Sequence, residues 1–262
     1  MRKFFITLTL LTLVGCTTSP TSTLPPKDKE LSRTINLARA AFEDGVTSRA
    51  IDFYRKALNR ARAMDDATEI GNAAYNLALC HIIIGQLDQA SVSLAEAEME
   101  FKRSGSNPAD VLLLEATIAQ RQGKLEQALS LADEVLSASP DENYRFQIAL
   151  LKGTIACEQD NPARARTALV EADKHHVTNA LLLAARERLA GNILLLEKNP
   201  MEAAAAFDRA ATLFQTAKHY RDMALALQRA GEAYREAGDR QREEDRLSRA
   251  TRSLAAQGEK TE

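Results

Sequence analysis

The chain has 262 residues, of which 45% are hydrophobic and 5% aromatic, and its formal net charge is −2. Its 45 alanines and 34 leucines favour an all-helical fold and argue against an all-β fold or a doubly wound sheet, because strands prefer branched and aromatic side chains. The hydrophobic content is too high for a disordered chain, and the near-neutral charge argues against a nucleic-acid-binding protein.

The first residues have the pattern of an export signal. Arg2 and Lys3 precede an apolar run over 4–14, which is too short for a membrane span of about 20 residues but fits a signal peptide over 1–15. The run ends in Leu13-Val14-Gly15-Cys16, which resembles the lipobox of bacterial lipoproteins. An ordinary signal peptide with an incidental cysteine is the alternative.

The lipobox resemblance implies cleavage before Cys16 and attachment of acyl chains, such as palmitate, to this residue. Because Thr and not Asp follows Cys16, the resemblance also implies anchoring in the outer membrane, with the rest of the chain facing the periplasm. Residues 16–30 then form the lipidated cysteine and a tether rich in Ser, Thr and Pro, without helical periodicity. Loss of Arg2 and Lys3 leaves 32 basic and 36 acidic residues, a formal net charge of −4.

The chain from 31 to 257 repeats itself every 37–40 residues. Each unit has a small residue on a first helix, then a turn, then a second helix on which small residues flank a bulky one. The leading small residues are Ala38, Ala78, Ala116, Gly153, Gly191 and Gly231. We expect six units, at about 31–67, 70–105, 108–140, 145–177, 180–218 and 221–257, followed by a tail over 258–262.

This pattern resembles the tetratricopeptide repeat (TPR), which implies a right-handed α-solenoid of helix-turn-helix units. The usual TPR period is about 34 residues, so the longer units predict an extra helical turn or longer loops. Each repeat would bury its apolar face against the next one. The last helix, about Asp239 to Ala256, is dense in charge, as suits a terminal helix with one face in water.

The turns within the units support this interpretation. Four units have a glycine there, which predicts a left-handed residue at the end of the first helix. These glycines are Gly45, Gly85, Gly123 and Gly238. Units four and five instead have Asn161-Pro162 and Asn199-Pro200, where Asn caps the second helix and Pro occupies its first position.

No catalytic or metal site is predicted, so we expect neither an enzyme nor a cofactor. His81 fits a packed side chain on the first helix of unit two, and His175-His176, placed near the end of the second helix of unit four, has no further ligand at metal-binding spacing. Cys80 and Cys157 lie two units apart, on the order of 20 Å, which is too far for a disulfide.

The TPR resemblance places a concave partner-binding groove on fixed positions of the first helices. These positions hold Asn72, Tyr75, Leu79, Ile82, Ile83, Leu113, Gln120, Arg121, Leu150, Thr154, Arg188, Asn192 and Leu195. Within 82–84 and 194–196, three consecutive apolar residues cannot all point into one interface, because successive helical residues turn by about 100°. The apolar patch expected there would bind a peptide or partner helix, a second protomer, or a neighbouring helix of the core.

The resemblance therefore implies a non-catalytic adaptor that holds another envelope protein in its groove. Lipidated TPR proteins of similar size include type IV pilus pilotins, which bring secretins to the outer membrane, an accessory of the β-barrel assembly machine, and adaptors that bring proteases to cell-wall hydrolases. The layout is most similar to the pilotins in length and repeat number. A self-associating structural protein of the envelope is a further alternative.

Overall fold

The computed structural model describes residues 28–258, which form twelve α-helices and contain no strand. The helices are α1 (Lys29–Glu43), α2 (Thr47–Ala63), α3 (Ala67–Ile83), α4 (Leu87–Ser104), α5 (Ala109–Arg121), α6 (Leu125–Ala138), α7 (Glu142–Glu158), α8 (Pro162–Ala172), α9 (Ala180–Leu196), α10 (Pro200–Thr216), α11 (Tyr220–Glu236) and α12 (Arg240–Gly258). The expected signal peptide, Cys16, most of the tether and the final residues 259–262 lie outside this range.

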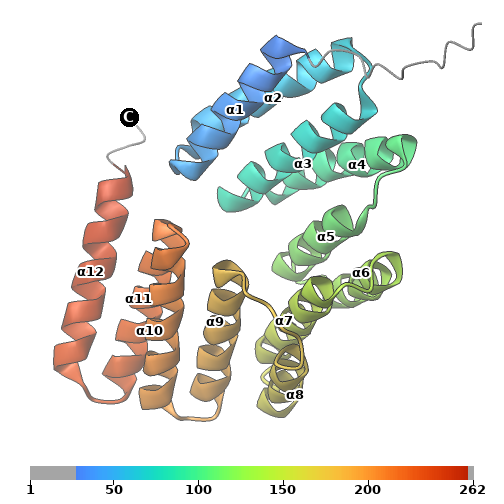
Figure 1. Cartoon of the computed structure of the whole chain (residues 1–262). Helices are drawn as coiled ribbons and strands as arrows, with labels where there is room; N and C mark the ends of the chain where they lie inside the picture. The colour runs from blue at the N-terminus through green and yellow to red at the C-terminus, as the bar shows by residue number, and fades with distance from the viewer. Residues whose placement is uncertain (1–27, 259–262) are drawn as a thin grey trace, which may run out of the picture.

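The helices form six antiparallel pairs that follow one another along an arc, with α1 near one end and α12 at the other (Figure 1). The core follows the same order. One cluster of buried side chains extends from α1 to α5, the next from α5 to α7, another from α7 to α10, and the last ones reach α12. Each pair thus buries its apolar surface against its neighbours in sequence, which confirms the predicted all-α solenoid.

Small residues allow the two helices of a pair to come together. Ala38, Ala78 and Ala116 are fully buried on the first helices of their pairs. At Gly191 the approach is closer still, because a Cβ atom there would lie 2.7 Å from the ring of Phe207 on α10. The bulky side chain of Phe207 also contacts the cluster formed with α11, so it fills the space between two repeats.

The longer period comes largely from longer helices. Six of the described helices have 17 residues, so the extra turn predicted from the period is present. The first helix begins at Lys29, two residues before the expected start of unit one, because the side chain of Asp28 accepts a hydrogen bond of 2.7 Å from the backbone of Leu31.

One predicted helix end is wrong. The second helix of repeat four ends at Ala172, so His175 and His176 lie in the connection to α9 and not on a helix. Two local contacts stabilise this connection. Val177 packs against the core cluster of α7–α10, and the side chain of Asn179 caps the start of α9. These local contacts replace the last turn that periodicity alone predicted.

The turn chemistry is confirmed in part: the side chain of Asn161 caps α8 by accepting a hydrogen bond of 3.0 Å from the backbone of Arg164, whereas the predicted cap by Asn199 is wrong, because its side chain makes no such bond at α10. Gly45, Gly85, Gly123 and Gly238 all have positive φ, between 73° and 80°. In repeats four and five, residues other than glycine adopt the left-handed backbone conformation. Asp160 and Lys198, just before the Asn-Pro pairs, have φ of 54° and 62°. The proline of each pair occupies the first turn of its helix, as predicted.

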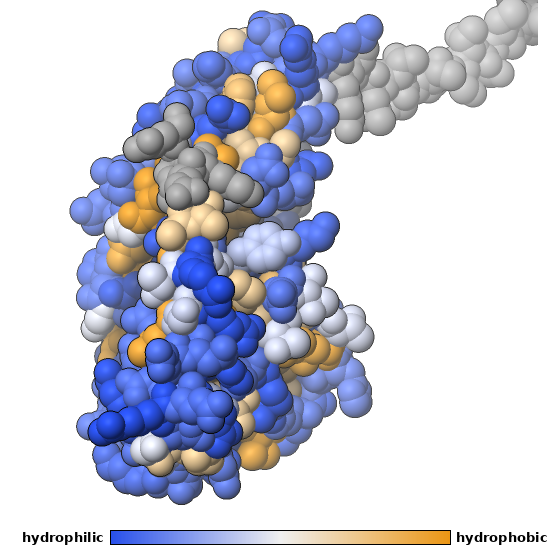
Figure 2. All heavy atoms as spheres, turned by 90° about the vertical axis from the view of Figure 1, so that its left-hand side faces the viewer, coloured by the Kyte–Doolittle hydropathy of each residue, from blue (hydrophilic) through white to orange (hydrophobic). Residues whose placement is uncertain are grey.

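The last helix closes the array with a polar surface. The face of the molecule over α12 is largely hydrophilic, in agreement with the charge density of that segment (Figure 2). Its Ala250 is buried against the core, whereas most other side chains of α12 are at least partly exposed. Among the described residues, every helix is too short or too polar to cross a bilayer.

Candidate protein-binding face

The first helices of the pairs carry the predicted groove positions, and we call the surface that they form the concave face; along it α5 contacts α7, and α7 contacts α9. Side chains connect them directly. Arg121 on α5 donates a hydrogen bond of 3.3 Å to the carbonyl of Ile82 on α3, and Gln120 donates to the carboxylate of Glu158 on α7. The guanidinium of Arg229 on α11 donates to Asn192 on α9 at 3.4 Å. These bonds link α3 to α5, α5 to α7 and α9 to α11.

The predicted groove residues differ in their exposure to solvent. Four are exposed: Asn72, Ile83, Arg121 and Arg188. Seven are partly buried: Tyr75, Leu79, Leu113, Gln120, Thr154, Asn192 and Leu195. Their assignment as partner contacts stays a prediction.

Two predicted groove residues belong to the core instead. Ile82 is 7% exposed and packs in a cluster with Val111 and Ile118, because α5 covers this end of α3. Leu150 is 8% exposed and packs with Leu189, because α9 covers this part of α7. Neither side chain offers a surface to a partner, and their inclusion in the groove is corrected.

The apolar triplet on α3 divides as expected from its geometry. Ile82 is buried, whereas Ile83 and Ile84 are 38% and 41% exposed at the end of the helix. On α11, Leu225 is 44% exposed at the same repeat position as Asn72. The sequence analysis missed Leu225, although extending the register to the sixth repeat identifies it.

The middle of the concave face carries positive charge. Arg188 on α9 is exposed, yet it makes no hydrogen bond or ion pair within residues 28–258. Loss of solvation lowers the pKa of its guanidinium, and the charge of Arg121 lowers it further, whereas Asp222 acts in the opposite direction.

The acidic groups of this face are engaged by neighbours. Asp110 on α5 accepts a hydrogen bond of 2.7 Å from the hydroxyl of Tyr144 on α7, and this bond, after burial, raises the pKa of the tyrosine. Burial, and then the charge of Asp110, raises the pKa of Tyr75 to about 12. Both phenols therefore stay neutral at physiological pH.

The histidines and cysteines have structural surroundings. His81 is buried, with its Nδ1 2.8 Å from Oε1 of Gln86, as expected for a packed side chain. Burial raises the pKa of the Cys80 and Cys157 thiols to about 12 and about 11, and both cysteines are free. The described part of the chain holds no group of three or more side chains arranged to bind a metal ion.

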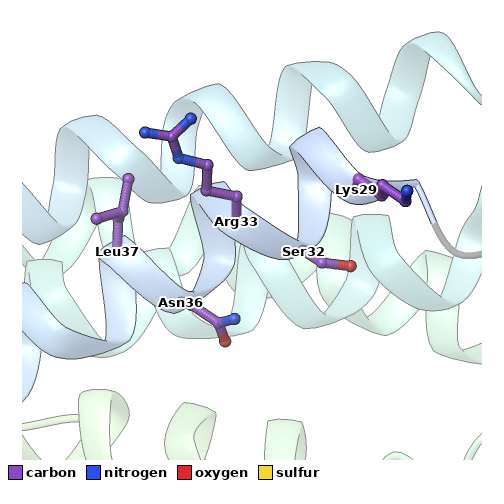
Figure 3. Close-up of a pocket in the computed structure, with 5 residues that line it drawn as sticks. All are labelled: Lys29, Ser32, Arg33, Asn36 and Leu37. Carbon is purple, nitrogen blue, oxygen red and sulfur yellow. The ribbon is translucent and has the colours of Figure 1, made fainter.

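A hollow of about 530 Å³ lies along the first turns of α1 (Figure 3). Lys29, Ser32, Arg33, Asn36 and Leu37 line it, so every lining side chain comes from one helix. Arg33 and Leu37 rise on one side of that helix while Asn36 points away on the other (Figure 3). This hollow at the end of the array is open to solvent, and its lining residues form no cluster of catalytic groups.

The comparisons with known proteins concern the fold. No protein-family model and no curated protein matches the chain. The Rap conjugation gene regulator of plasmid pLS20, solved in complex with the Phr* peptide, is similar with a TM-score of 0.66 at 15% identity, over 89% of this chain and 76% of that one. BtubC (BKLC) from P. vanneervenii gives a TM-score of 0.52 at 20% identity, over 88% and 93%. The fold is that of a TPR solenoid.

The TPR-like fold explains why the concave face collects exposed side chains. Between repeats, the second helix of one pair packs against the first helix of the next, as α2 does against α3 and α10 against α11, and first helices also contact each other at α5–α7 and α7–α9. The concave face carries polar, apolar and basic residues in turn. Such a surface is suited to a peptide or helix, and it lacks the converging acids, bases and nucleophiles of an active site in the described residues.

Proposed function

We propose that this TPR solenoid is a non-catalytic scaffold of the bacterial cell envelope that holds a protein partner on its concave face. The observation that carries the proposal is the concave face of the first helices, where Ile83, Arg121, Arg188 and Leu225 are all exposed. An apolar or basic side chain exposed on the inner side of an arc is accessible to an extended peptide or a single helix. The Rap regulator with a similar fold was solved with a peptide bound, which supports the proposal by analogy.

We propose further that the chain is anchored to the outer membrane through lipid on Cys16 and faces the periplasm. The support is the lipobox Leu13-Val14-Gly15-Cys16 behind a signal-like run. Two or more acyl chains attach a protein stably to a membrane, whereas one does so marginally. Between Cys16 and the first helix, about a dozen residues would span at most roughly 40 Å, so the solenoid would work close to the membrane surface.

Metabolic labelling with an alkyne analogue of palmitate tests the anchor. The full chain should take up the label and sediment with membranes, and a Cys16→Ser variant should lose both properties. Label on the Cys16→Ser variant would contradict lipidation at this site, and a labelled chain found with inner-membrane fractions would contradict the outer-membrane assignment.

A partner pull-down after crosslinking in intact cells tests the binding face. We expect Ile83→Asp and Leu225→Asp to lose the main partner, because both place a charge on the concave face without disturbing the core. Val170→Asp on the second helix α8 is the matched control, since Val170 is 56% exposed. Retention of the partner by both concave variants would contradict the proposal. A secretin among the lost partners would support the pilotin-like alternative.

One observation favours self-association as a second candidate function. Val92 and Met99, seven residues apart on α4, are 73% and 58% exposed and lie on the same side of that helix. Exposed apolar residues on one helical face are suited to pairing with a second copy. Sedimentation of the full chain in detergent would show a dimer that Val92→Asp dissociates, whereas a monomer at all concentrations would exclude this candidate.

A further inference from the structure

We propose that α1 docks on the anionic phospholipid surface of the membrane through Lys29, Arg33 and Leu37, which we call the end stripe. All three side chains are exposed, and because they are four positions apart they lie on one side of the helix. Arg33 and Leu37 rise on that side together (Figure 3). The inference rests on the proposed lipid anchor at Cys16 and specifies which part of the solenoid meets the membrane.

The first argument is what later repeats hold at the position of Arg33, five residues before the leading small residue Ala38. Four of them have a buried apolar residue there, namely Ala73, Val111, Ile148 and Ala226. Val111 and Ile148 each pack in a cluster with side chains of the preceding repeat. Arg33 therefore lies on the face that a preceding repeat would cover, and within residues 28–258 no helix covers it.

Leu37 shows the same difference between the first repeat and the later ones. It precedes the leading small residue of its repeat, and it is 43% exposed. Leu77, at the equivalent position of repeat two, is 6% exposed and packs in the core. An apolar side chain is thus left uncovered beside two cations at this end of the array.

Repeat five shows how an arginine at the position of Arg33 is accommodated when another element lies beside it. The guanidinium of Arg186 donates hydrogen bonds of 2.9 and 2.7 Å to the carboxylate of Asp173, directly after α8 of the preceding repeat. Arg33 has no carboxylate partner in the part of the chain that the structure describes. A guanidinium carries five N–H donors and no acceptor, so Arg33 can donate to an external anion.

The acidic residues next to the end stripe are engaged elsewhere. Asp28 and Glu30 pair with Arg60 on α2, at 2.8 and 3.7 Å. Lys29 takes part in no ion pair among the described residues, and a positive charge in the first turn opposes the helix dipole. The helix therefore gains no stability from the charge of Lys29, which is available to an external anion.

The other end of the array is polar in a different way. On α12, Arg242 pairs with Asp239 at 2.6 Å, and Arg246 pairs with Asp208 at 2.8 Å. These cations are neutralised within the chain, as is sufficient for a terminal helix in water. The end stripe instead combines unpaired cations with an exposed leucine, which is the combination that binds at a membrane surface.

The length of the chain before α1 and the charge of the end stripe favour the membrane as the occupant. The residues between Cys16 and Lys29 would span at most roughly 40 Å, so α1 would be the part of the solenoid nearest to the anchor in sequence. Anionic phospholipids attract Lys and Arg close to the surface. The tether makes this contact intramolecular, so that even a weak attraction between α1 and the lipid is effective.

Tryptophan fluorescence tests the contact, because the chain has no tryptophan of its own. The full chain with Leu37→Trp is purified in detergent from bacterial membranes. It is then reconstituted into vesicles of phosphatidylcholine brominated on the acyl chains, with or without phosphatidylglycerol. Bromine quenches a tryptophan at the boundary of headgroups and acyl chains, so we expect a loss of at least about half of the fluorescence with phosphatidylglycerol. The loss without phosphatidylglycerol should be several-fold smaller.

Matched variants decide whether the end stripe is responsible. Lys29→Gln/Arg33→Gln, made in the same chain, should reduce the quenching several-fold. Arg164→Gln/Arg221→Gln removes two exposed charges from α8 and α11 and should leave the quenching unchanged. Val170→Trp, which places the tryptophan on an exposed position of α8 instead, should not be quenched. Thermal unfolding of all variants confirms that they fold.

Flotation of the vesicles on a density gradient reports the anchor, whereas quenching reports the docking face. A chain that floats with both kinds of vesicle without quenching at position 37, or with equal quenching in both, would overturn the docking face and leave the anchor. A blue-shifted emission without quenching would assign this face to a second copy of the chain and also overturn the proposal. Flotation and quenching only with phosphatidylglycerol would support the docking face and overturn the anchor. A chain that floats with neither kind would overturn both.

Discussion

The guanidinium of Arg246 on α12 donates two hydrogen bonds, of 2.8 and 3.0 Å, to the carboxylate of Asp208 on α10. The hydroxyl of Tyr234 on α11 donates to the same carboxylate at 2.9 Å. The guanidinium of Arg242 lies 4.5 Å from the centre of the Tyr234 ring. One carboxylate therefore links three helices of the last two repeats, where the terminal helix has no following repeat to pack against.

Replacing this carboxylate should loosen the end of the solenoid. Asp208→Ala leaves a largely buried phenol and a guanidinium without their shared acceptor, and we expect a loss of about 1–2 kcal/mol in the free energy of unfolding. Urea unfolding followed by circular dichroism measures the change. Asp245→Ala is the control, because the Asp245 side chain is 51% exposed and solvent screens its ion pair with Arg246, so this pair should contribute little. Equal losses for both variants would contradict this account.

The contact between Gly191 and Phe207 predicts a strong effect from a single methyl group. Gly191→Ala would place a Cβ 2.7 Å from a fully buried ring, and we expect a loss of about 1–3 kcal/mol in stability. In the double variant Gly191→Ala/Phe207→Leu the smaller side chain makes room for the methyl group. The two effects should therefore be less than additive in a double-mutant cycle of unfolding free energies. Strictly additive changes in unfolding free energy would contradict a direct clash between the added methyl group and the Phe207 ring.

Two substitutions in the left-handed turns should change the stability of the protein in opposite directions. Lys198 has φ of 62°, so Lys198→Gly should raise stability by up to about 1 kcal/mol, because glycine adopts this conformation without a steric penalty. Gly85 has φ of 76° and nothing within 4 Å of a Cβ, so Gly85→Ala should lower stability by about 1 kcal/mol through backbone strain alone. Thermal unfolding of both variants decides, and changes of the same sign would be inconsistent with this explanation.

The ionisation of Glu115 should make the stability of the protein depend on pH. Burial raises its pKa above the ordinary 4.5, and the charge of Glu98 raises it further, although Lys102 opposes the shift. A raised pKa in the folded state means that ionised Glu115 lowers stability at neutral pH and that this effect disappears once the pH falls below the unfolded pKa. Glu115→Gln should therefore stabilise the protein at pH 7 and have no effect at pH 3.5. Urea midpoints at the two pH values test this, and an equal gain at both would contradict it.

The repeat architecture could be predicted because it depends on local signals. Ala38, Ala78 and Ala116 mark the contact of paired helices by their size alone, and the glycines of the turns require left-handed backbone. These requirements recur at a fixed period, so each repeat supports the assignment of the others. The turns of repeats four and five followed from Asn-Pro chemistry, although no sequence rule identified Asp160 and Lys198 as left-handed residues.

The candidate site could be predicted only in part, because exposure depends on how far each repeat is covered by the next. Ile82 and Ile83 are neighbours in sequence, and only the position of α5 decides that one is buried and the other exposed. Leu150 is covered by α9 in the same way.

Position-specific photo-crosslinking in intact cells tests the central claim most directly. A photoreactive phenylalanine analogue is introduced at Ile83 or Leu225 on the concave face, and at Val92 on the outer face as the reference. All three side chains are exposed, so none of these changes should disturb the core. We predict that positions 83 and 225 crosslink to the same envelope protein and that position 92 does not. Crosslinking of that partner from position 92 alone, or equally from all three, would contradict a concave binding face.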